Sequence, residues 1–467
     1  MTSNSFASEA LSRLPLAEAA FLMLDDIFQN NTLEAIYQSN RGRTYTRILT
    51  FSSFFQLLRD SLISPDHSAR ARLIDASENG ELPTSLKAFY DKLAHMPPEV
   101  GAGLLSHSYR AISKLLPRKM TSKLPKSLCK LTVVAVDGKV IKHTMRRLLP
   151  LRISKQNASK LLGGKALVAV NLSTGLVMEM ASELDGEASE TRLLAPLLQQ
   201  LKDHCGEKLI VADRCYGFYK HIAMIKDDGC HFVLRVASIT QFIQDPEKPA
   251  RIGKDRYGRK LIEEHGWITS QKNTKLIAVR RLSIIRDKVQ IQLLTDLTDS
   301  KRYPADDIAE IYRYRWDIER VYATITKVFQ LRHLIGTSPE AGLIQASLCL
   351  ILFNITEAIK WHISVGNGKK IDEVSGEMLW RDIRDEVMAA TRLLRTRDVQ
   401  MLLQGIKQEV GILERLTELL GNLWKKKWAK SKVGRTDPTK IPNPKPQKLK
   451  QTTCHDSVFR VMKRAKK

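Results

Sequence analysis

The chain has 467 residues, of which 43% are hydrophobic, and its 75 basic residues exceed its 50 acidic residues to give a formal net charge of +25. This length predicts two to four domains, and the hydrophobic content excludes wholesale disorder. The positive charge predicts attraction to a polyanion, usually DNA or RNA. A basic protein with no nucleic-acid role is the alternative.

Residues 1–125 predict a helical region. Apolar residues recur there at three-and-four spacing in four segments, and turn-rich stretches separate the segments. The stretch Pro83-Thr84-Ser85 stands where it can cap the third segment. Several short helices ahead of a central domain often bind DNA, with a plain helical bundle as the alternative. The four segments are residues 17–28, 51–62, 86–93 and 109–116.

The central region changes to alternating strands and helices. Its order is three strands, helix, strand, helix, strand, which predicts an α/β fold with an RNase H-like mixed sheet flanked by helices. The first and fourth strands end in Asp137 and Asp213. The predicted strands are residues 131–137, 166–172, 176–181, 209–213 and 231–236, and the predicted helices are residues 189–201 and 217–226.

The pattern after residue 236 predicts a β-rich insertion at about 237–300, followed by one long amphipathic helix at 305–328. Residues 341–355 are strongly apolar but fewer than the ~20 residues that cross a bilayer, so we expect a buried core helix and no membrane partner. Residues 366–430 are helical again, with leucines that serve either the core or a dimer contact.

The last 44 residues, from Trp424, carry 15 Lys or Arg against 2 Asp, a net charge of +13. Four prolines in this stretch break helices, so residues 431–467 predict a flexible basic tail that contacts phosphates without reading sequence. A solvated tail without function is the alternative. Six scattered cysteines and the lack of a signal-peptide pattern predict a cytoplasmic protein.

Two groups of residues suggest chemistry on phosphodiesters. Asp137 and Asp213 follow short apolar strands, where ligands gather in α/β sheets, although a single such Asp is more often a turn residue. Carboxylates are the ligands that hard divalent ions prefer for phosphoryl transfer. Tyr312, Arg315 and Glu319 share one face of the expected helix, where an Arg can grip a phosphate. An exposed Arg–Glu salt bridge is the alternative.

These residues lie in segments that resemble a known family. YRYRWDIE resembles the Y-x2-R-x3-E signature of the DDE transposases of bacterial insertion sequences, in the group named for its Tyr-Arg-Glu-Lys motif. VVAVDGK and LIVADRCYGFY resemble the segments around that family's two catalytic aspartates. LLTDL resembles the strand that re-enters the core, and FQLRHLIGTSPEAGLIQASLCLILFNI resembles the region downstream of the signature. The resemblance covers roughly residues 130–360.

The resemblance implies a catalytic triad of Asp137, Asp213 and Glu319 that binds Mg²⁺, for which Mn²⁺ can substitute. It implies that Tyr312 and Arg315 contact DNA phosphates near the scissile bond. The implied reaction frees a 3′-hydroxyl at a transposon end and joins it to target DNA. Joining two ends implies at least a homodimer in the DNA complex.

The chain departs from the family pattern in three places. The signature Lys normally stands seven residues after the Glu, but that position is Thr326 here and the next residue is Lys327. Eight residues of α-helix rotate by about 800°, which turns Lys327 about 80° off the face of Glu319. Its role as a DNA-binding residue therefore depends on its long side chain. Lys139 and Cys215 replace a usual Thr or Ser and a usual Gly.

The expected organisation has four parts. Residues 1–125 bind DNA ends, 126–365 form the catalytic domain with its insertion, 366–430 form a helical region that can dimerise, and 431–467 form the tail. Two alternative functions remain open. One is an RNase H-like nuclease that cleaves but does not join, and the other is a DNA-binding protein whose site has decayed.

Overall fold

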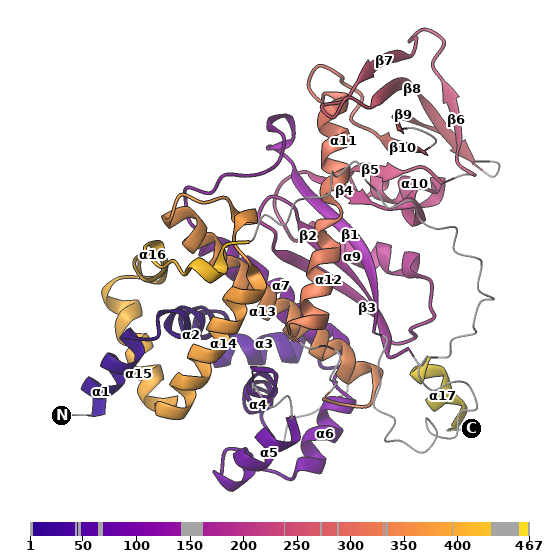
Figure 1. Ribbon diagram of the computed structural model, residues 1–467. Helices are drawn as coiled ribbons and strands as arrows, with labels where there is room; N and C mark the ends of the chain where they lie inside the picture. Colours follow the sequence, from indigo (N-terminus) through magenta and orange to yellow (C-terminus); the bar gives the residue numbers. More distant parts are fainter. Residues whose placement is uncertain are drawn as a thin grey trace.

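The computed structural model describes residues 3–42, 44, 48–63, 69–141, 162–237, 239–270, 273–286, 289–329, 331, 335–394, 396–430 and 457–465. Figure 1 shows a central sheet, a β-rich arm at one end of that sheet, and a helical region at the other end.

The central sheet has the RNase H-like topology, which confirms the predicted fold class. Its strands follow the order β3-β2-β1-β4-β5. The first three strands are antiparallel neighbours, and β4 and β5 continue the sheet parallel to β1. These strands are β1 Thr132–Ile141, β2 Gly164–Asn171, β3 Val177–Glu183, β4 Lys208–Ala212 and β5 His231–Arg235.

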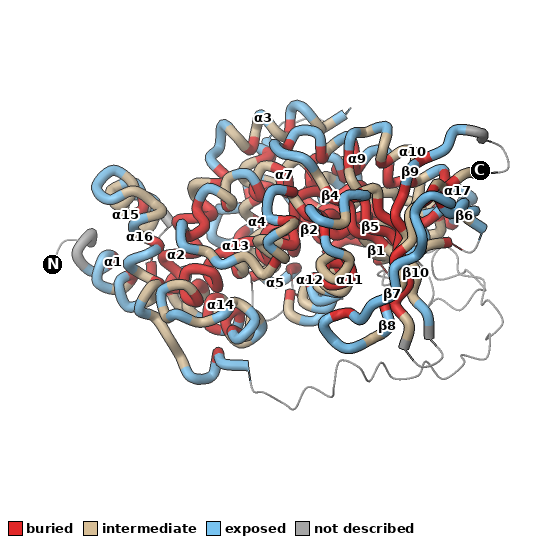
Figure 2. Tube along the Cα trace, turned by 90° about the horizontal axis from the view of Figure 1, so that it is seen from above, coloured by how far each residue is buried: buried red, intermediate tan, exposed pale blue. Residues whose placement is uncertain are grey.

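Helices cover both faces of this sheet. α9 Leu194–Lys202 and α10 Tyr219–Asp227 lie on one face, and α11 Ala305–Tyr314 and α12 Asp317–Lys327 lie on the other (Figure 2). Because both faces are covered, the middle strands read as continuous apolar runs rather than alternating ones. Residues 133–136 of β1 and 209–212 of β4 are accordingly all buried.

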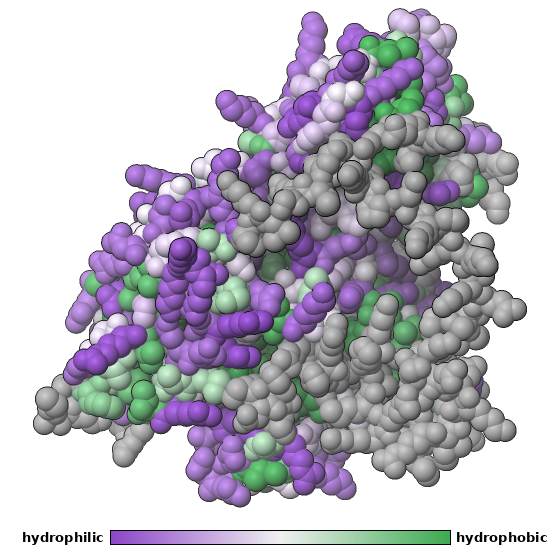
Figure 3. All heavy atoms as spheres, in the orientation of Figure 1, coloured by the Kyte–Doolittle hydropathy of each residue, from purple (hydrophilic) through white to green (hydrophobic). Residues whose placement is uncertain are grey.

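The predicted β-rich insertion is present and extends the central sheet. Its last strand pairs antiparallel with β5, so core and insertion form one hydrogen-bonded path of strands. The strands are β6 Gln241–Gln244, β7 Arg251–Lys254, β8 Lys260–Ser270, β9 Asn273–Arg286 and β10 Val289–Thr295. Hydrophobic atoms are visible among hydrophilic ones on this arm (Figure 3). Ile252 of β7 is one of the exposed large apolar residues of the chain.

The prediction of one long helix at 305–328 is wrong, because α11 ends at Tyr314 and α12 begins at Asp317. The N–H groups of Ile318 and Glu319 bond three residues back, to the carbonyls of Arg315 and Trp316. These bonds form a tighter turn than an α-helix between α11 and α12. Arg315 and Glu319 nevertheless remain neighbours one turn apart, as expected for the signature residues, because their side chains form an i,i+4 ion pair.

The N-terminal and C-terminal helices pack together (Figure 1). α2 Pro15–Ile27 packs against α14 Gly376–Leu393 and α16 Ile412–Gly421, and α7 Pro98–Lys114 packs against α13 Pro339–Gly366 and β3. The buried side chains of these elements belong to the same cluster as the sheet core. The other α-helices are α1 Ser3–Ser12, α3 Asn30–Asn40, α4 Phe51–Ile63, α5 Ala69–Glu78, α6 Leu86–Ala94, α15 Thr396–Glu409 and α17 Val458–Ala465.

Two details of the helical regions match the predictions. The hydroxyl of Ser85 accepts the N–H of Ala88 at 3.2 Å and caps α6. Leu416 and Leu420 of α16 are buried within the chain, which favours the core interpretation of these two leucines. α13 is long and apolar enough to cross a membrane, but its most apolar window is fully buried inside the protein, as in a core helix.

The region expected to be a flexible tail contains the helix α17. The N–H of Val458 bonds to the carbonyl of Leu162, and Arg460 forms ion pairs with Asp185 and Glu187 at 2.7 and 2.6 Å. The flexible tail is therefore corrected for residues 457–465, because these contacts dock them beside the end of β3. Residues 431–456 lie outside the described part of the chain.

Candidate active site

The register of the sheet makes Asp137 and Asp213 neighbours. β1 and β4 are parallel, and their last paired residues are Val136 and Ala212. Asp137 and Asp213 are the next residues on each strand, so they emerge together where the parallel pairing ends. The prediction that these two aspartates meet at one edge of the sheet therefore has a geometric basis in the strand register.

The two aspartates are held differently. Asp213 directly follows the last residue of β4, close to the predicted strand end, and its Oδ1 accepts the N–H of Cys215 at 2.8 Å. This bond caps a short 3-10 turn, η4 Arg214–Tyr216. The expectation that Asp137 ends its strand is wrong, because β1 continues to Ile141 and pairs Asp137 with Val168 of β2. The antiparallel ladder with β2 extends the strand beyond the point where β4 stops.

Asp137 lies in an electrostatic environment that disfavours its charge. Burial raises the pKa of Asp137 to about 6, and the carboxylates of Glu190 and Asp213 add to this effect. The guanidinium of Arg315 opposes the increase in the pKa. A buried carboxylate beside two further acids attracts a cation, because a cation relieves their mutual repulsion.

Glu190 belongs to this acidic group and was missed by the sequence analysis. It opens the short 3-10 helix η3 Glu190–Leu193, and its Oε1 accepts the hydroxyl of Tyr216 at 2.6 Å. Burial raises the pKa of Glu190, and the charge of Asp213 raises it further. The available signal was weak: an acid in the first turn of the predicted helix after the third strand.

Arg315 joins the acidic pair to the third predicted acid. Its Nη2 lies 3.9 Å from Oε1 of Glu319, and its side chain is only 8% exposed, whereas that of Glu319 is 45% exposed. Among the described residues the buried Nε of Arg315 has no hydrogen-bond partner. A buried guanidinium with a free donor, beside Asp137 and Glu319, is suited to receive a phosphate oxygen.

Two tyrosines support this arrangement from the helices. Tyr312 is 9% exposed, and its ring centroid lies 5.8 Å from the guanidinium of Arg315. Burial raises the pKa of Tyr312, while the positive charge of Arg315 lowers it. The hydroxyl of Tyr322 donates to the backbone carbonyl of Asp137 and so attaches α12 to β1.

The remaining predicted residues lie at the edge of the site. Lys327 is exposed at the last position of α12, eight residues after Glu319. Its side chain is not brought to the acidic group by the contacts that the structure describes. Lys139 lies over the ring of Tyr322 at 5.5 Å. Cys215 is exposed, and burial of its thiol together with the nearby Asp213 raises its pKa to about 11, which does not favour a thiolate.

The donor set fits a divalent metal ion. Asp137, Asp213, Glu190 and Glu319 offer only carboxylate oxygens, which hard cations such as Mg²⁺ and Mn²⁺ prefer. The uncompensated charge around Asp137 supports the fit. Within the described ranges, however, no three acidic, His or Cys side chains already stand together as ligands of a single ion.

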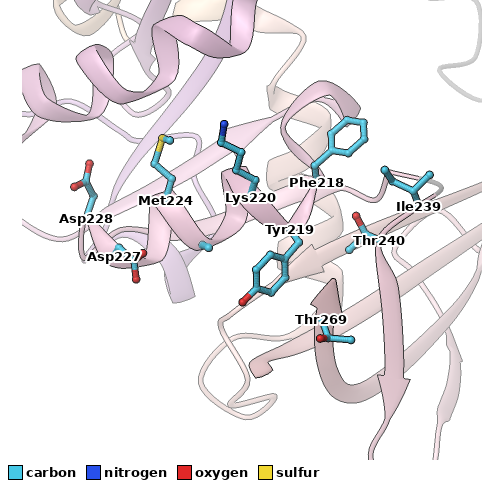
Figure 4. A pocket seen from close by; sticks show the side chains of 10 residues that line it. Phe218, Tyr219, Lys220, Met224, Asp227, Asp228, Ile239, Thr240 and Thr269 are labelled. Atoms are coloured by element: carbon cyan, nitrogen blue, oxygen red, sulfur yellow. The ribbon is translucent and has the colours of Figure 1, made fainter. Parts of the chain in front are cut away.

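A cavity of about 660 Å³ lies between α10 and the insertion (Figure 4). Phe218, Tyr219 and Lys220 line it from the start of α10, and Thr240 and Thr269 line it from the insertion. The hydroxyl of Tyr219 donates to the carbonyl of Lys275, which joins the two walls. None of the predicted site residues lines this cavity.

The fold and the site define a class of protein, an RNase H-like domain with carboxylates at the end of its central strands. Residues 129–355 match a family model described as the transposase DDE domain. This match, together with the curated relative described next, confirms the resemblance to the DDE transposases of insertion sequences.

The chain is also similar to a curated transposase and to a solved transposase structure. Over 81 residues the chain is 30% identical to the transposase InsG for insertion sequence element IS4 of Escherichia coli (strain K12). This match spans 17% of the chain and 18% of that relative. A piggyBac transposase synaptic complex with hairpin DNA has a TM-score of 0.38 and 11% identity, covering 83% of this chain and 85% of its own.

Proposed function

We propose that the chain is a transposase that binds the ends of an insertion sequence, cleaves the DNA and joins the freed 3′-hydroxyl ends to target DNA. The observation that carries this proposal is the convergence of side chains where the parallel pairing of β1 and β4 stops. There the adjacent Asp137 and Asp213 face a buried Arg315 whose Nε is unpartnered among the described residues. The transposase DDE domain match supports the same reaction class.

In the proposed reaction each residue has a separate task. Asp137, Asp213 and Glu319 hold divalent ions, with Mg²⁺ as the expected ion and Mn²⁺ as a substitute. When bound, these ions activate the attacking oxygen and neutralise charge on the phosphate. Arg315 binds a non-bridging phosphate oxygen, and Tyr312 keeps the guanidinium in place. Lys327 contacts the DNA backbone further along α12.

The proposed partners follow from the chemistry and the charge. Transposon ends and target DNA are the substrates, and the net charge of +25 favours their phosphate backbones. Joining two ends requires two active sites, so we propose a homodimer in the DNA complex. The proposed place of action is the cytoplasm.

An assay of DNA cleavage and strand joining tests the proposed transposase function directly. The protein is incubated with Mg²⁺ and a DNA that carries its element's ends, and Glu319→Gln is compared with the unaltered protein. We expect the variant to lose cleavage by roughly a thousandfold or more, as when one member of a catalytic group is removed. The control is Asp317→Asn, which changes an acid of the same helix that pairs with Lys123 and Arg320.

The outcomes distinguish the candidate functions. Cleavage that persists in Glu319→Gln contradicts the assignment of Glu319. Cleavage by the unaltered protein without joined products supports a nuclease in place of a transposase. DNA binding with no cleavage in either metal supports the decayed site.

A further inference from the structure

Glu190 connects the two chain segments that carry the aspartates. Its Oε1 accepts the hydroxyl of Tyr216, which belongs to the turn capped by Asp213. Its carboxylate also lies against the backbone of Gly138, the residue that follows Asp137. One side chain therefore contacts both chain segments at the positions where the parallel pairing of β1 and β4 stops and the acidic pair emerges.

We propose that Glu190 is a positioning residue of the acidic site, which sets the spacing of Asp137 and Asp213 and adds the third carboxylate charge that attracts a divalent cation. This inference rests on the proposed function, because the cation is the one that the transposition reaction requires. It extends the site beyond the three acids expected from the family resemblance.

The close packing at Gly138 supports the proposal. A Cβ atom on Gly138 would lie 1.9 Å from Oε2 and 2.0 Å from Cδ of Glu190. The carboxylate therefore occupies the space that any other residue at position 138 would fill. The absence of a side chain there allows Glu190 to lie directly against the backbone beside Asp137.

The position of the Glu190 charge also supports the proposal that this residue positions the aspartate pair. The carboxylate of Glu190 lies against the backbone of Gly138, next to Asp137. Glu319 instead stands on α12, with its Oε1 3.9 Å from Nη2 of Arg315 and its side chain 45% exposed. The negative charge packed against the chain beside Asp137 is therefore that of Glu190. The unpartnered Nε of Arg315, considered within the described residues, independently indicates that this centre is open to a phosphate ligand.

Binding of Mn²⁺ to the full-length protein without DNA tests the proposal, with free Mn²⁺ followed by electron paramagnetic resonance. Glu190→Gln keeps the shape and an acceptor for Tyr216 but removes the charge. We expect its Kd for Mn²⁺ to rise about tenfold or more, within the range typical of residues that support metal ligands. The metal-free melting temperature should stay unchanged or rise, because a like charge has been removed.

Two further variants separate charge from structure. Glu187→Gln changes a partly buried acid of the same loop, which pairs with Arg460, and should leave the Kd unchanged. Tyr216→Phe keeps the charge of Glu190 and removes one hydrogen bond, so we expect a smaller increase in the Kd of about threefold. Tyr216→Phe also provides the measurement if Glu190→Gln does not fold.

The proposal is overturned if Glu190→Gln binds Mn²⁺ as tightly as the unaltered protein, or if it loses only thermal stability. A protein that binds no Mn²⁺ at all overturns both this inference and the proposed function. A protein that binds Mn²⁺ through Glu190 but cleaves no DNA overturns the proposed function alone.

Discussion

The backbone of Gly138 is not in the left-handed region, so a glycine is not required there for its backbone angle. It is required because the carboxylate of Glu190 fills the space that a side chain would occupy. Gly138→Ala should push the end of the flexible Glu190 side chain away, at a modest cost of about 1 kcal/mol in the free energy of unfolding. Mn²⁺ affinity should fall about as much as in Glu190→Gln. Urea unfolding and Mn²⁺ titration check the two effects.

A double-mutant cycle tests whether Gly138 acts through Glu190. In a Glu190→Ala background, the substitution Gly138→Ala meets no carboxylate and should change Mn²⁺ affinity little. If the two effects add fully, then Gly138 acts independently of Glu190 and the spatial explanation is wrong.

His362 provides a pH prediction in the helical core. Its Nε2 donates to the carbonyl of Leu115 at 2.8 Å, and burial lowers its pKa below 6.5. Protonation therefore favours the unfolded chain, so the stability contributed by neutral His362 is present above pH ~6.5 and is lost as the pH falls below it. The free energy of unfolding should decrease from pH 7 to pH 5.

The comparison with His362→Gln isolates this effect, because glutamine keeps a donor for Leu115 but does not titrate. His107 has the same direction of pKa shift, and Asp137 has the opposite consequence, since its pKa is raised. The difference in the free energy of unfolding between the unaltered protein and His362→Gln should become smaller as the pH falls. A difference that is constant across the range contradicts the prediction.

The sequence predicted individual acids where they follow buried strands, because a strand buried on both faces leaves a continuous apolar run. Asp137 and Asp213 were found in this way. Glu190 was not, because its contacts with Gly138 and Tyr216 join residues 52 and 26 positions apart, and no local pattern records such a contact.

At the scale of elements, the turn between β7 and β8 holds α11. Arg256 bonds to Asp306 and Asp307, and the hydroxyl of Tyr257 donates to Glu310 at 2.9 Å. Arg313 also pairs with Glu310 and stacks over the ring of Tyr257. The insertion therefore anchors the helix that leads directly into Arg315.

Two substitutions compare how much the contacts of Tyr257 and Arg256 contribute to the free energy of unfolding. Tyr257→Phe removes a hydrogen bond from Glu310, which is only 4% exposed, and should cost about 1.5–3 kcal/mol in the free energy of unfolding. Arg256→Ala breaks more exposed ion pairs and should cost less than about 1 kcal/mol. Urea denaturation measures both, and equal losses would contradict the ranking.

The sequence predicted the order of the core elements but not the break between α11 and α12. Apolar positions keep a helical spacing through Arg315 and Trp316, so periodicity alone reads one helix. The break depends on hydrogen bonds three residues back and on the attachment of α12 to β1 through Tyr322. Both are consequences of packing against the sheet.

At the scale of the whole molecule, α17 attaches the end of the chain to the loop that leads to Glu190. Arg460→Glu places a negative charge against Asp185 and Glu187, so α17 should detach. Hydrogen exchange of the amides in 458–465 should then accelerate at least about tenfold, while exchange in the sheet is unchanged. Lys463→Glu, at an exposed position of α17, is the matched control and should retain protection.

If exchange in α17 is the same in Arg460→Glu and in the unaltered protein, the two ion pairs do not hold this helix. The helix was missed because the prolines and charge of the preceding residues dominate the composition of the tail. The spacing of Val458, Val461 and Met462 carries a short amphipathic signal within it.

The pairing of β10 with β5 has a mechanical consequence. A domain on a hinge can swing without breaking hydrogen bonds, but this insertion shares a ladder with the strand beside β4. Any large rotation of the arm must break hydrogen bonds of that ladder, so the arm and the central sheet should move as one rigid body. Under the proposed function, a DNA segment bound at the tip of the arm would therefore stay at a fixed position relative to the acids. Strain in that DNA would then act on the scissile phosphate and would not be relieved by motion of the arm.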